Sequence, residues 1–168
     1  IGRALGLEPE WVELLRHAAP MHDVGKIGIP DAILLKPGRL TDEERTLMSR
    51  HARIGHDILR DEQYSPLLEL AAEIALNHHE KWDGSGYPQG LRGEEIPLSA
   101  RIVALCDVYD ALRSSRPYKP AWTAENAQAY ILEQAGQHFD PQLVAIMRLL
   151  FDDLEAMQQC LADVQPSG

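Results

Sequence analysis

Six residues in four separated segments of the chain are of the types that hold divalent metals. They are His22 and Asp23, His51, the adjacent pair His78 and His79, and Asp107. Mixed imidazole and carboxylate ligands suit iron, manganese or zinc. An aspartate can bridge two ions with its two oxygens, and adjacent histidines on a helix point about 100° apart, so they serve neighbouring ions better than one ion. If the four segments converge, they predict a metal centre with at least two ions.

Each of these residues has a simpler explanation when it is considered alone. A single buried histidine is more often a hydrogen-bonded core residue, and Asp23 or Asp107 could be a capping or ion-paired carboxylate. The explanation weakens for the complete set, because burying several polar groups without partners is costly. The ordered set His-Asp, His, His-His, Asp therefore indicates a shared site more strongly than any one member does.

The elements that position these residues are expected to be helices, because no segment shows the alternation typical of a strand. Apolar spacing and capping signals predict six or seven helices, the main ones beginning near Glu8-Pro9, Thr41, Ser65-Pro66, Arg101, Thr123 and Asp140-Pro141. The first leads toward His22 if it survives Pro20, the second carries His51 on its apolar face, and the third leads to His78. We expect one all-α domain over residues 1–164, followed by a polar tail at residues 165–168.

Residues 80–97 are expected to form a long loop, because glycine and proline occur there too often for a helix. Gly84 and Gly86 are expected to allow positive φ angles or close backbone approach. Trp82 could be an ordinary packing aromatic. Tyr87-Pro88 could shape a substrate pocket or present a surface to a partner, and the sequence does not choose between the two.

Composition and charge exclude some partners. The net charge of −10 over 168 residues argues against a nucleic-acid groove or an anionic membrane surface, both of which need basic patches. It does not exclude an anionic substrate, because bound divalent cations would dominate the local field. The two cysteines form no disulfide framework, so the cytoplasm is the expected compartment. Because the chain starts at Ile1, we expect it to be a fragment of a longer protein.

Several motifs of the chain occur together in a known family. They are HDVGKIGIPD at residues 22–31, HHEKWDGSGYP at 78–88, DVYDAL at 107–112, RPYK at 116–119 and FDP at 139–141. In this combination the chain resembles the HD-GYP subgroup of the HD superfamily of metal-dependent phosphohydrolases. The resemblance extends from about residue 5 to residue 151.

The resemblance implies a bacterial signalling phosphodiesterase that hydrolyses cyclic di-GMP to linear pGpG and, in some members, on to GMP. Carried over by position, the metal ligands would be His22, Asp23, His51, His78, His79 and Asp107. Two ions are expected, iron or manganese before zinc. Members with three ions add a glutamate and a histidine from a helix that would lie before Ile1, so a third ion is left open.

The resemblance also implies roles in catalysis and substrate binding. Asp23 and Lys26 would be catalytic, and Lys26, Arg116 and Lys119 would bind the substrate phosphates, with arginine suited to a bidentate grip. Two metals would lower the pKa of a bridging water, so that hydroxide could attack phosphorus in line near neutral pH. The alternative for Lys26 is a solvated cation that follows a helix end.

Two functions of other kinds stay open. The first is a regulatory module that binds a cyclic dinucleotide without hydrolysis, or that docks a diguanylate cyclase through the Gly86-Tyr87-Pro88 loop. The second is an HD phosphohydrolase for another cyclic dinucleotide or nucleotide. An upstream sensory or receiver domain, as in a two-component response regulator, is expected in the full-length protein.

Overall fold

The computed structural model describes residues 1–60, 65–115 and 120–164, with side chains described as far as residue 157. Its α-helices are α1 (Pro9–Ala18), α2 (Asp31–Leu34), α3 (Asp42–Leu59), α4 (Pro66–Asn77), α5 (Leu98–Arg113), α6 (Ala124–Glu133), α7 (Pro141–Leu149) and α8 (Phe151–Val164). Three short 3₁₀ helices are η1 (Ala19–Met21), η2 (Val24–Gly28) and η3 (Gly93–Glu95). No strand occurs in the described ranges, so the predicted all-α class is confirmed.

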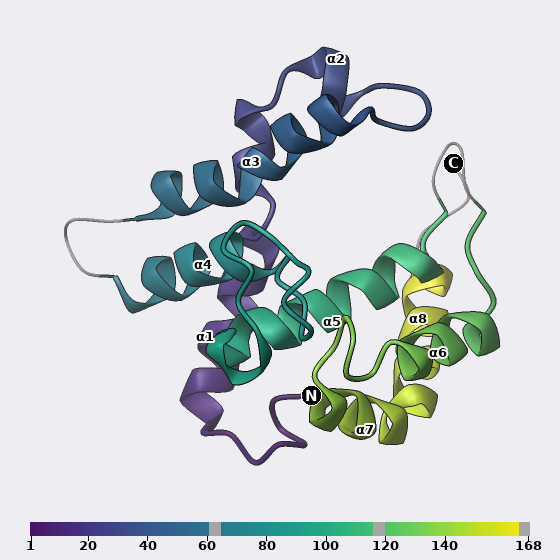
Figure 1. Ribbon diagram of the computed structural model, residues 1–168. Helices are drawn as coiled ribbons and strands as arrows, with labels where there is room; N and C mark the ends of the chain where they lie inside the picture. The colour runs from purple at the N-terminus through teal and green to yellow at the C-terminus, as the bar shows by residue number, and fades with distance from the viewer. Residues whose placement is uncertain (61–64, 116–119, 165–168) are drawn as a thin grey trace.

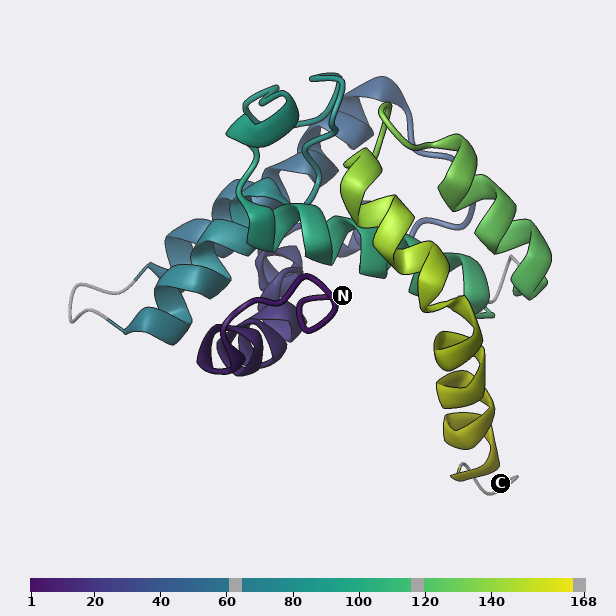
Figure 2. The same cartoon turned by 90° about the horizontal axis from the view of Figure 1, so that it is seen from below.

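Helices α4 and α5 form the centre of the domain. Helix α3 lies beside α4, α1 packs below them, and α6, α7 and α8 gather at the far end of α5 (Figure 1). Ala71, Ile74, Ala75 and Leu105 on the two central helices are fully buried in one apolar cluster. Burial of such side chains is the main favourable contribution to folding. Helix α8 follows α7, begins beside the end of α5 and extends from there away from the rest of the domain (Figure 2).

The capping signals read from the sequence are confirmed. Thr41 Oγ1 accepts a hydrogen bond from the Glu44 amide at 3.3 Å, and the Glu44 carboxylate accepts one from the Thr41 amide at 2.8 Å. This capping box starts α3, as expected. Ser65, Thr123 and Asp140 cap α4, α6 and α7 through their side chains. Local chemistry therefore determines where these helices begin.

The structure divides the chain more finely than the apolar pattern does. The short helix α2 lies within the irregular stretch after Gly25, and Leu150 separates α7 from α8 with a ψ angle of 1°. The first helix ends at Ala18, before Pro20, and η1 carries the chain on to His22. No helix among the described residues is both long and apolar enough to cross a membrane.

Candidate metal centre

Four of the six predicted metal ligands lie together. Asp23, His51, His78 and His79 each offer one atom within 4.8 Å of the others. Asp23 precedes η2, His51 lies in the middle of α3, and the two histidines follow the last turn of α4. His51 and His78 are 1% and 2% exposed, so the cluster is closed to water on that side.

Backbone carbonyls orient three of the imidazole rings. The Nδ1–H groups of His22, His51 and His78 donate to the carbonyl oxygens of Ala19 at 2.8 Å, Met48 at 2.7 Å and Ala75 at 3.0 Å. A carbonyl can only accept, so Nδ1 carries the proton and Nε2 of the neutral ring keeps its lone pair. Metal-binding histidines in proteins are held in this way.

The Nε2 atoms of His51, His78 and His79 face one another at short range. His51 Nε2 lies 3.1 Å from His79 Nε2 and 3.5 Å from His78 Nε2. Asp23 Oδ1 lies 3.5 Å from His51 Nε2 and 3.8 Å from His78 Nε2. The Nε2 lone pairs of His51 and His78 and the Asp23 carboxylate converge at these distances, where a cation between them would be attracted by all three. The donor set therefore fits a divalent metal.

His22 and Asp107 lie next to this cluster, on the other oxygen of Asp23. His22 Nε2 is 3.4 Å from Asp23 Oδ2 and 3.6 Å from Asp107 Oδ1. This buried nitrogen has no hydrogen-bond partner. The two oxygens of Asp23 thus face two different groups of ligand atoms, which is the arrangement that a bridge between two ions needs.

The electrostatics separate the histidines into two kinds. Burial lowers the pKa of His78 to about 4 and that of His79 to about 3, which keeps both rings neutral and able to bind a metal. The carboxylates of Asp107 and Asp23 raise the pKa of His22 to about 10. Burial raises the pKa of Asp23, but contacts with His22 and Lys26 outweigh it and leave the pKa below its usual value. Metal binding at His22 must therefore displace a proton.

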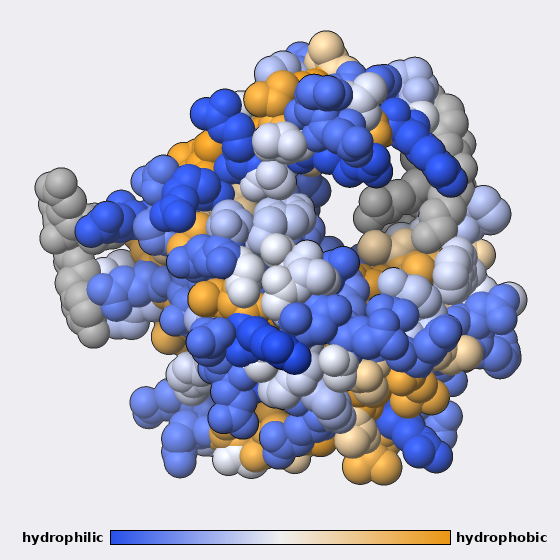
Figure 3. Space-filling model, in the orientation of Figure 1, coloured by the Kyte–Doolittle hydropathy of each residue, from blue (hydrophilic) through white to orange (hydrophobic). Residues whose placement is uncertain are grey.

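Lys26 is paired with the candidate metal centre. Its ammonium lies 2.5 Å from Asp23 Oδ2, although its side chain is 41% exposed. The surface is hollowed between the α2–α3 end of the molecule and α5 (Figure 3). Arg116 and Lys119, the other two predicted phosphate-binding residues, lie outside the described residues.

A close approach of backbones places Asp23 against α3. A Cβ added to Gly25 would collide with the carbonyl oxygen of His51 and the amide of Gly55. Only glycine fits there, because the obstructing atoms belong to the backbone. The Gly25–Gly55 contact therefore brings η2, directly after Asp23, onto the turn of α3 that follows His51.

The loop at residues 80–97 packs against His79, the second of the two adjacent histidines. The Tyr87 ring stacks on the His79 ring with centroids 4.8 Å apart, and the Tyr87 amide donates to the His79 carbonyl. A Cβ on Gly86 would lie 2.5 Å from that same carbonyl oxygen. The glycine thus allows the loop to fold back on the histidine, as expected, and Gly84 has the expected positive φ of 83°.

A buried glutamate holds this loop in place. The Glu80 carboxylate, 2% exposed, accepts hydrogen bonds from the amides of Gln89 at 2.7 Å and Leu91 at 3.0 Å. Such charge-assisted bonds are about twice as strong as neutral ones. The side chain of Glu80, the first residue of the loop, therefore holds the later part of the same loop in place.

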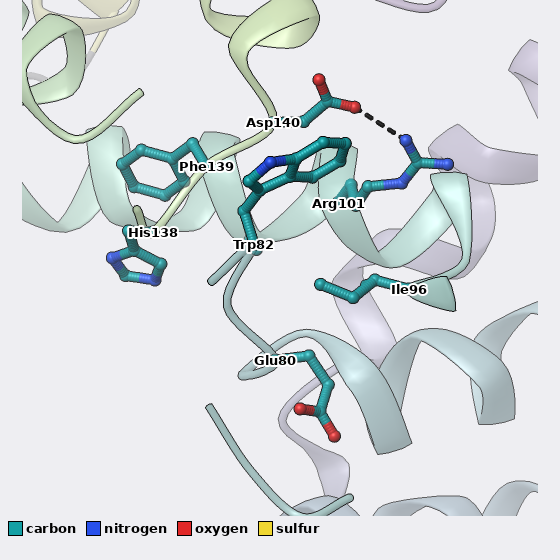
Figure 4. A pocket seen from close by; sticks show the side chains of 8 residues that line it. Glu80, Trp82, Ile96, Arg101, His138, Phe139 and Asp140 are labelled. Carbon is teal, nitrogen blue, oxygen red and sulfur yellow. Dashed lines mark hydrogen bonds and ion pairs between the residues drawn. The ribbon is translucent and has the colours of Figure 1, made fainter. Parts of the chain in front are cut away.

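Trp82 anchors the loop to the rest of the domain. The Arg101 guanidinium lies 5.7 Å from the Trp82 ring centroid and binds Asp140 at 2.7 Å (Figure 4). The Trp82 amide donates to the His138 carbonyl. These groups enclose a cavity of about 10 Å³. Trp82 is thus a packing aromatic with a cation over its face.

The residues that support the site are the ones that sequence reasoning missed. Glu80 follows the two histidines directly, and its position after them is the only local signal. Arg101 and Asp140 are 39 residues apart, so no spacing rule could pair them. Gly25 and Gly55 fall on different elements, and their contact depends on packing.

The fold and the site together define a helical metal-binding domain, in which histidines and aspartates from separate helices meet at one buried point. The model of the HD domain family matches residues 1–143. The chain belongs to this family, and its resemblance to the HD-GYP members is confirmed.

Two curated relatives illustrate the likeness. A cyclic di-GMP phosphodiesterase of Vibrio cholerae is 58% identical over 142 residues, which are 82% of this chain and 29% of that protein. A 3'3'-cGAMP-specific phosphodiesterase 2 of the same organism is 44% identical over 158 residues, which are 94% of this chain and 30% of that protein. The chain thus spans under a third of the length of these relatives.

A solved structure shows the same fold. The HDG"Y"P protein from Bdellovibrio bacteriovorus superposes with a TM-score of 0.67 at 23% sequence identity, covering 92% of this chain and 47% of the other. At this identity the likeness concerns the arrangement of the helices. It agrees with the all-α class read from the sequence.

Proposed function

We propose that this chain is a phosphodiesterase domain that hydrolyses cyclic di-GMP to linear pGpG and, with a second cleavage, to GMP. The observation that carries the proposal is the convergence of His51, His78 and His79 on Asp23, in a chain 58% identical to a cyclic di-GMP phosphodiesterase. A neutral binding pocket would not need several imidazole lone pairs directed at one point.

The ligands for two divalent ions would be His22, Asp23, His51, His78, His79 and Asp107. Iron or manganese is our first expectation, and zinc also suits these donors. When bound, the ions supply an activated water and neutralise the phosphate that is attacked. A third ion would need ligands beyond these six.

The chain's own residues would bind and orient the substrate. Asp23 offers one oxygen to each ligand group and so fixes their separation. Lys26, held beside Asp23 Oδ2, places a positive charge where negative charge develops on the non-bridging phosphate oxygens. Arg116 and Lys119 would bind the phosphates, and this part of the proposal depends on the sequence alone.

A second substrate has a specific observation in its favour. The relative that is 44% identical is named a 3'3'-cGAMP-specific phosphodiesterase. Cyclic di-GMP and 3'3'-cGAMP share the phosphodiester ring and differ in one base, so the same metal centre could serve both. The base contacts would then decide between them.

The test is a comparison of hydrolysis rates in metal-replete protein. Wild type loaded with manganese or iron should cleave cyclic di-GMP faster than 3'3'-cGAMP, and both Asp23→Ala and His79→Ala should abolish turnover. His17→Ala, an exchange on the exposed surface of α1, is the matched control and should keep the wild-type rate. Turnover retained in both site variants would refute the proposal.

The same experiment addresses a regulatory role. Tight binding of the dinucleotide without hydrolysis would favour the non-catalytic module, and capture of a diguanylate cyclase that depends on Tyr87 would favour docking through the loop. We place the domain in the cytoplasm, downstream of a sensory or receiver domain, because cyclic dinucleotide signals act there. Neither nucleic acid nor membrane is a proposed partner.

A further inference from the structure

Helix α8 is fastened to α5 at a point outside the metal centre. Glu155 on α8 accepts a hydrogen bond from the Tyr109 hydroxyl at 2.6 Å and another from the Arg113 guanidinium at 2.6 Å. Tyr109 and Arg113 are one helical turn apart on the same face of α5, so one carboxylate can bind both side chains. The Tyr109 ring also stacks on Phe151, with centroids 6.0 Å apart.

The contact is shielded from water and extends to a third segment. The side chains of Arg113 and Glu155 are 17% and 21% exposed, and Tyr109 is 4% exposed. The Arg113 guanidinium also donates to the Trp122 carbonyl at 2.6 Å, and the Trp122 amide donates to the Leu112 carbonyl at 2.8 Å. The end of α5 is therefore held both by α8 and by the chain that enters α6.

This contact lies on the opposite side of α5 from the metal centre. Asp107 precedes Tyr109 by two residues, which places the two side chains about 200° apart around the helix. Asp107 lies toward His22, with 3.6 Å between Oδ1 and Nε2, while Tyr109 lies toward α8. Helix α8 thus supports α5 from behind the carboxylate.

We infer that Glu155 is a positioning residue for Asp107, and through it for the metal ion that His22 and Asp107 would share. Loss of the carboxylate removes the partner that Tyr109 and Arg113 share, so α8 holds this turn of α5 less firmly. The Trp122 carbonyl and the Phe151 ring remain in contact with this turn. The remaining ligands lie just before η2, on α3 and just after α4, and these three elements pack mainly on one another. The effect should therefore fall on one ion of the two.

The inference rests on the proposed metal site and concerns a residue beyond the part of the chain that the HD domain model matches. The family match ends at residue 143, and α8 begins at Phe151. A helix beyond the residues that the HD domain model matches would thus control how firmly the second ion is held.

The experiment measures manganese binding directly, without substrate. Metal-free protein is titrated with Mn²⁺ while free Mn²⁺ is followed by electron paramagnetic resonance, and wild type should bind a tighter and a weaker ion. Glu155→Ala should raise the dissociation constant of the weaker ion about tenfold, as changes behind a metal ligand do. The tighter ion should be unaffected.

Three further variants make the result specific. Asp153→Asn changes an exposed carboxylate on the same helix and should match wild type. Asp107→Ala should remove the weaker ion altogether. Glu155→Gln keeps an oxygen that can accept from Tyr109, so it should restore part of the affinity lost in Glu155→Ala.

Three outcomes would overturn the inference: unchanged binding of both ions in Glu155→Ala, equal weakening of both ions, or a wild type whose binding is insensitive to Asp107→Ala. Hydrolysis of cyclic di-GMP is measured on the same samples. A wild type that binds two ions without turnover would refute the proposed function, and the effect of Glu155→Ala on binding would still decide the inference.

Discussion

At the scale of single residues, the candidate site depends on which nitrogen of each imidazole carries a proton. Carbonyl oxygens one turn earlier in the chain fix Nδ1–H in His51 and His78. The Nε2 atoms of these two buried rings lie 3.5 Å apart. The sequence identified these histidines because they fall at the ends or on the apolar faces of predicted helices. It could not give their tautomers, which depend on the geometry of one helical turn.

Tyr87 offers a test at this scale, because its ring stacks on His79 at 4.8 Å. Aromatic pairs contribute about 0.5–1.5 kcal/mol beyond burial, so Tyr87→Ala should weaken Mn²⁺ binding by about three- to tenfold. Tyr87→Phe keeps the ring and should bind as wild type does. Calorimetric titration of metal-free protein checks both, and equal affinities in the two variants would show that the stack does not orient His79.

His138 should make stability depend on pH. Burial, followed by the charge of Lys81, lowers the pKa of His138 to about 4, below the ordinary value of 6.5. Between these values the unfolded chain binds a proton that the folded chain excludes, so the contribution is present above pH 6.5 and is lost as the pH falls toward 4.

Urea unfolding of metal-free protein at pH 7 and pH 5 measures this effect. His138→Asn should show a smaller difference in the free energy of unfolding between the two pH values than wild type does. His17→Asn, on the exposed surface of α1, serves as the control and should keep the wild-type difference. A His138 variant that also keeps it would contradict the prediction.

At the scale of elements, close backbone contacts and buried polar anchors determine which helix turns meet. The capping box at Thr41 and the prolines at helix starts could be predicted from the sequence, because they act within one turn of the chain. The approach of η2 to α3 and the pairing of Arg101 with Asp140 are contacts between distant segments. No local pattern encodes them.

The Gly25–Gly55 contact gives a graded prediction. Gly25→Ala would place a methyl group against the backbone of His51 and Gly55, so it should lower the free energy of unfolding by about 1–3 kcal/mol or more. Gly55→Ala meets Ala75 Cβ at 3.2 Å and the Gly25 amide at 3.3 Å, and alanine favours a helix by about 1 kcal/mol over glycine.

Gly55→Ala should therefore be close to neutral. Urea unfolding compares the two glycine variants, and Mn²⁺ binding by each tells whether Asp23 has moved. Equal stability of the two would show that η2 can shift away from α3 without cost.

At the scale of the whole molecule, the candidate metal ligands come from four separate segments of the chain. These segments are the one after α1, α3, the end of α4 and the middle of α5. Ions held by these ligands would link the four segments to one another. Stability and metal content should therefore change together.

Removal of metal should destabilise the domain. A ligand at about 100 times its dissociation constant adds about 2.7 kcal/mol to the free energy of unfolding, so chelation should lower the melting temperature and added Mn²⁺ should restore it. Asp23→Ala, which lacks the bridging carboxylate, should respond to neither treatment. Equal melting temperatures for chelated and reloaded wild type would contradict a metal centre that links the helices.

The sequence by itself determined the helical class, the starts of the main helices and the six candidate ligands, because side-chain type, spacing and capping act over short distances. The tertiary structure alone decided that Asp23 directs its two oxygens to different ligand groups, that Tyr87 stacks on His79, and that α8 supports α5 behind Asp107. The first and the third depend on how helices far apart in the chain pack, and the second depends on how the loop after α4 folds back. Packing is fixed by the sum of many contacts, each too weak to leave a local signature.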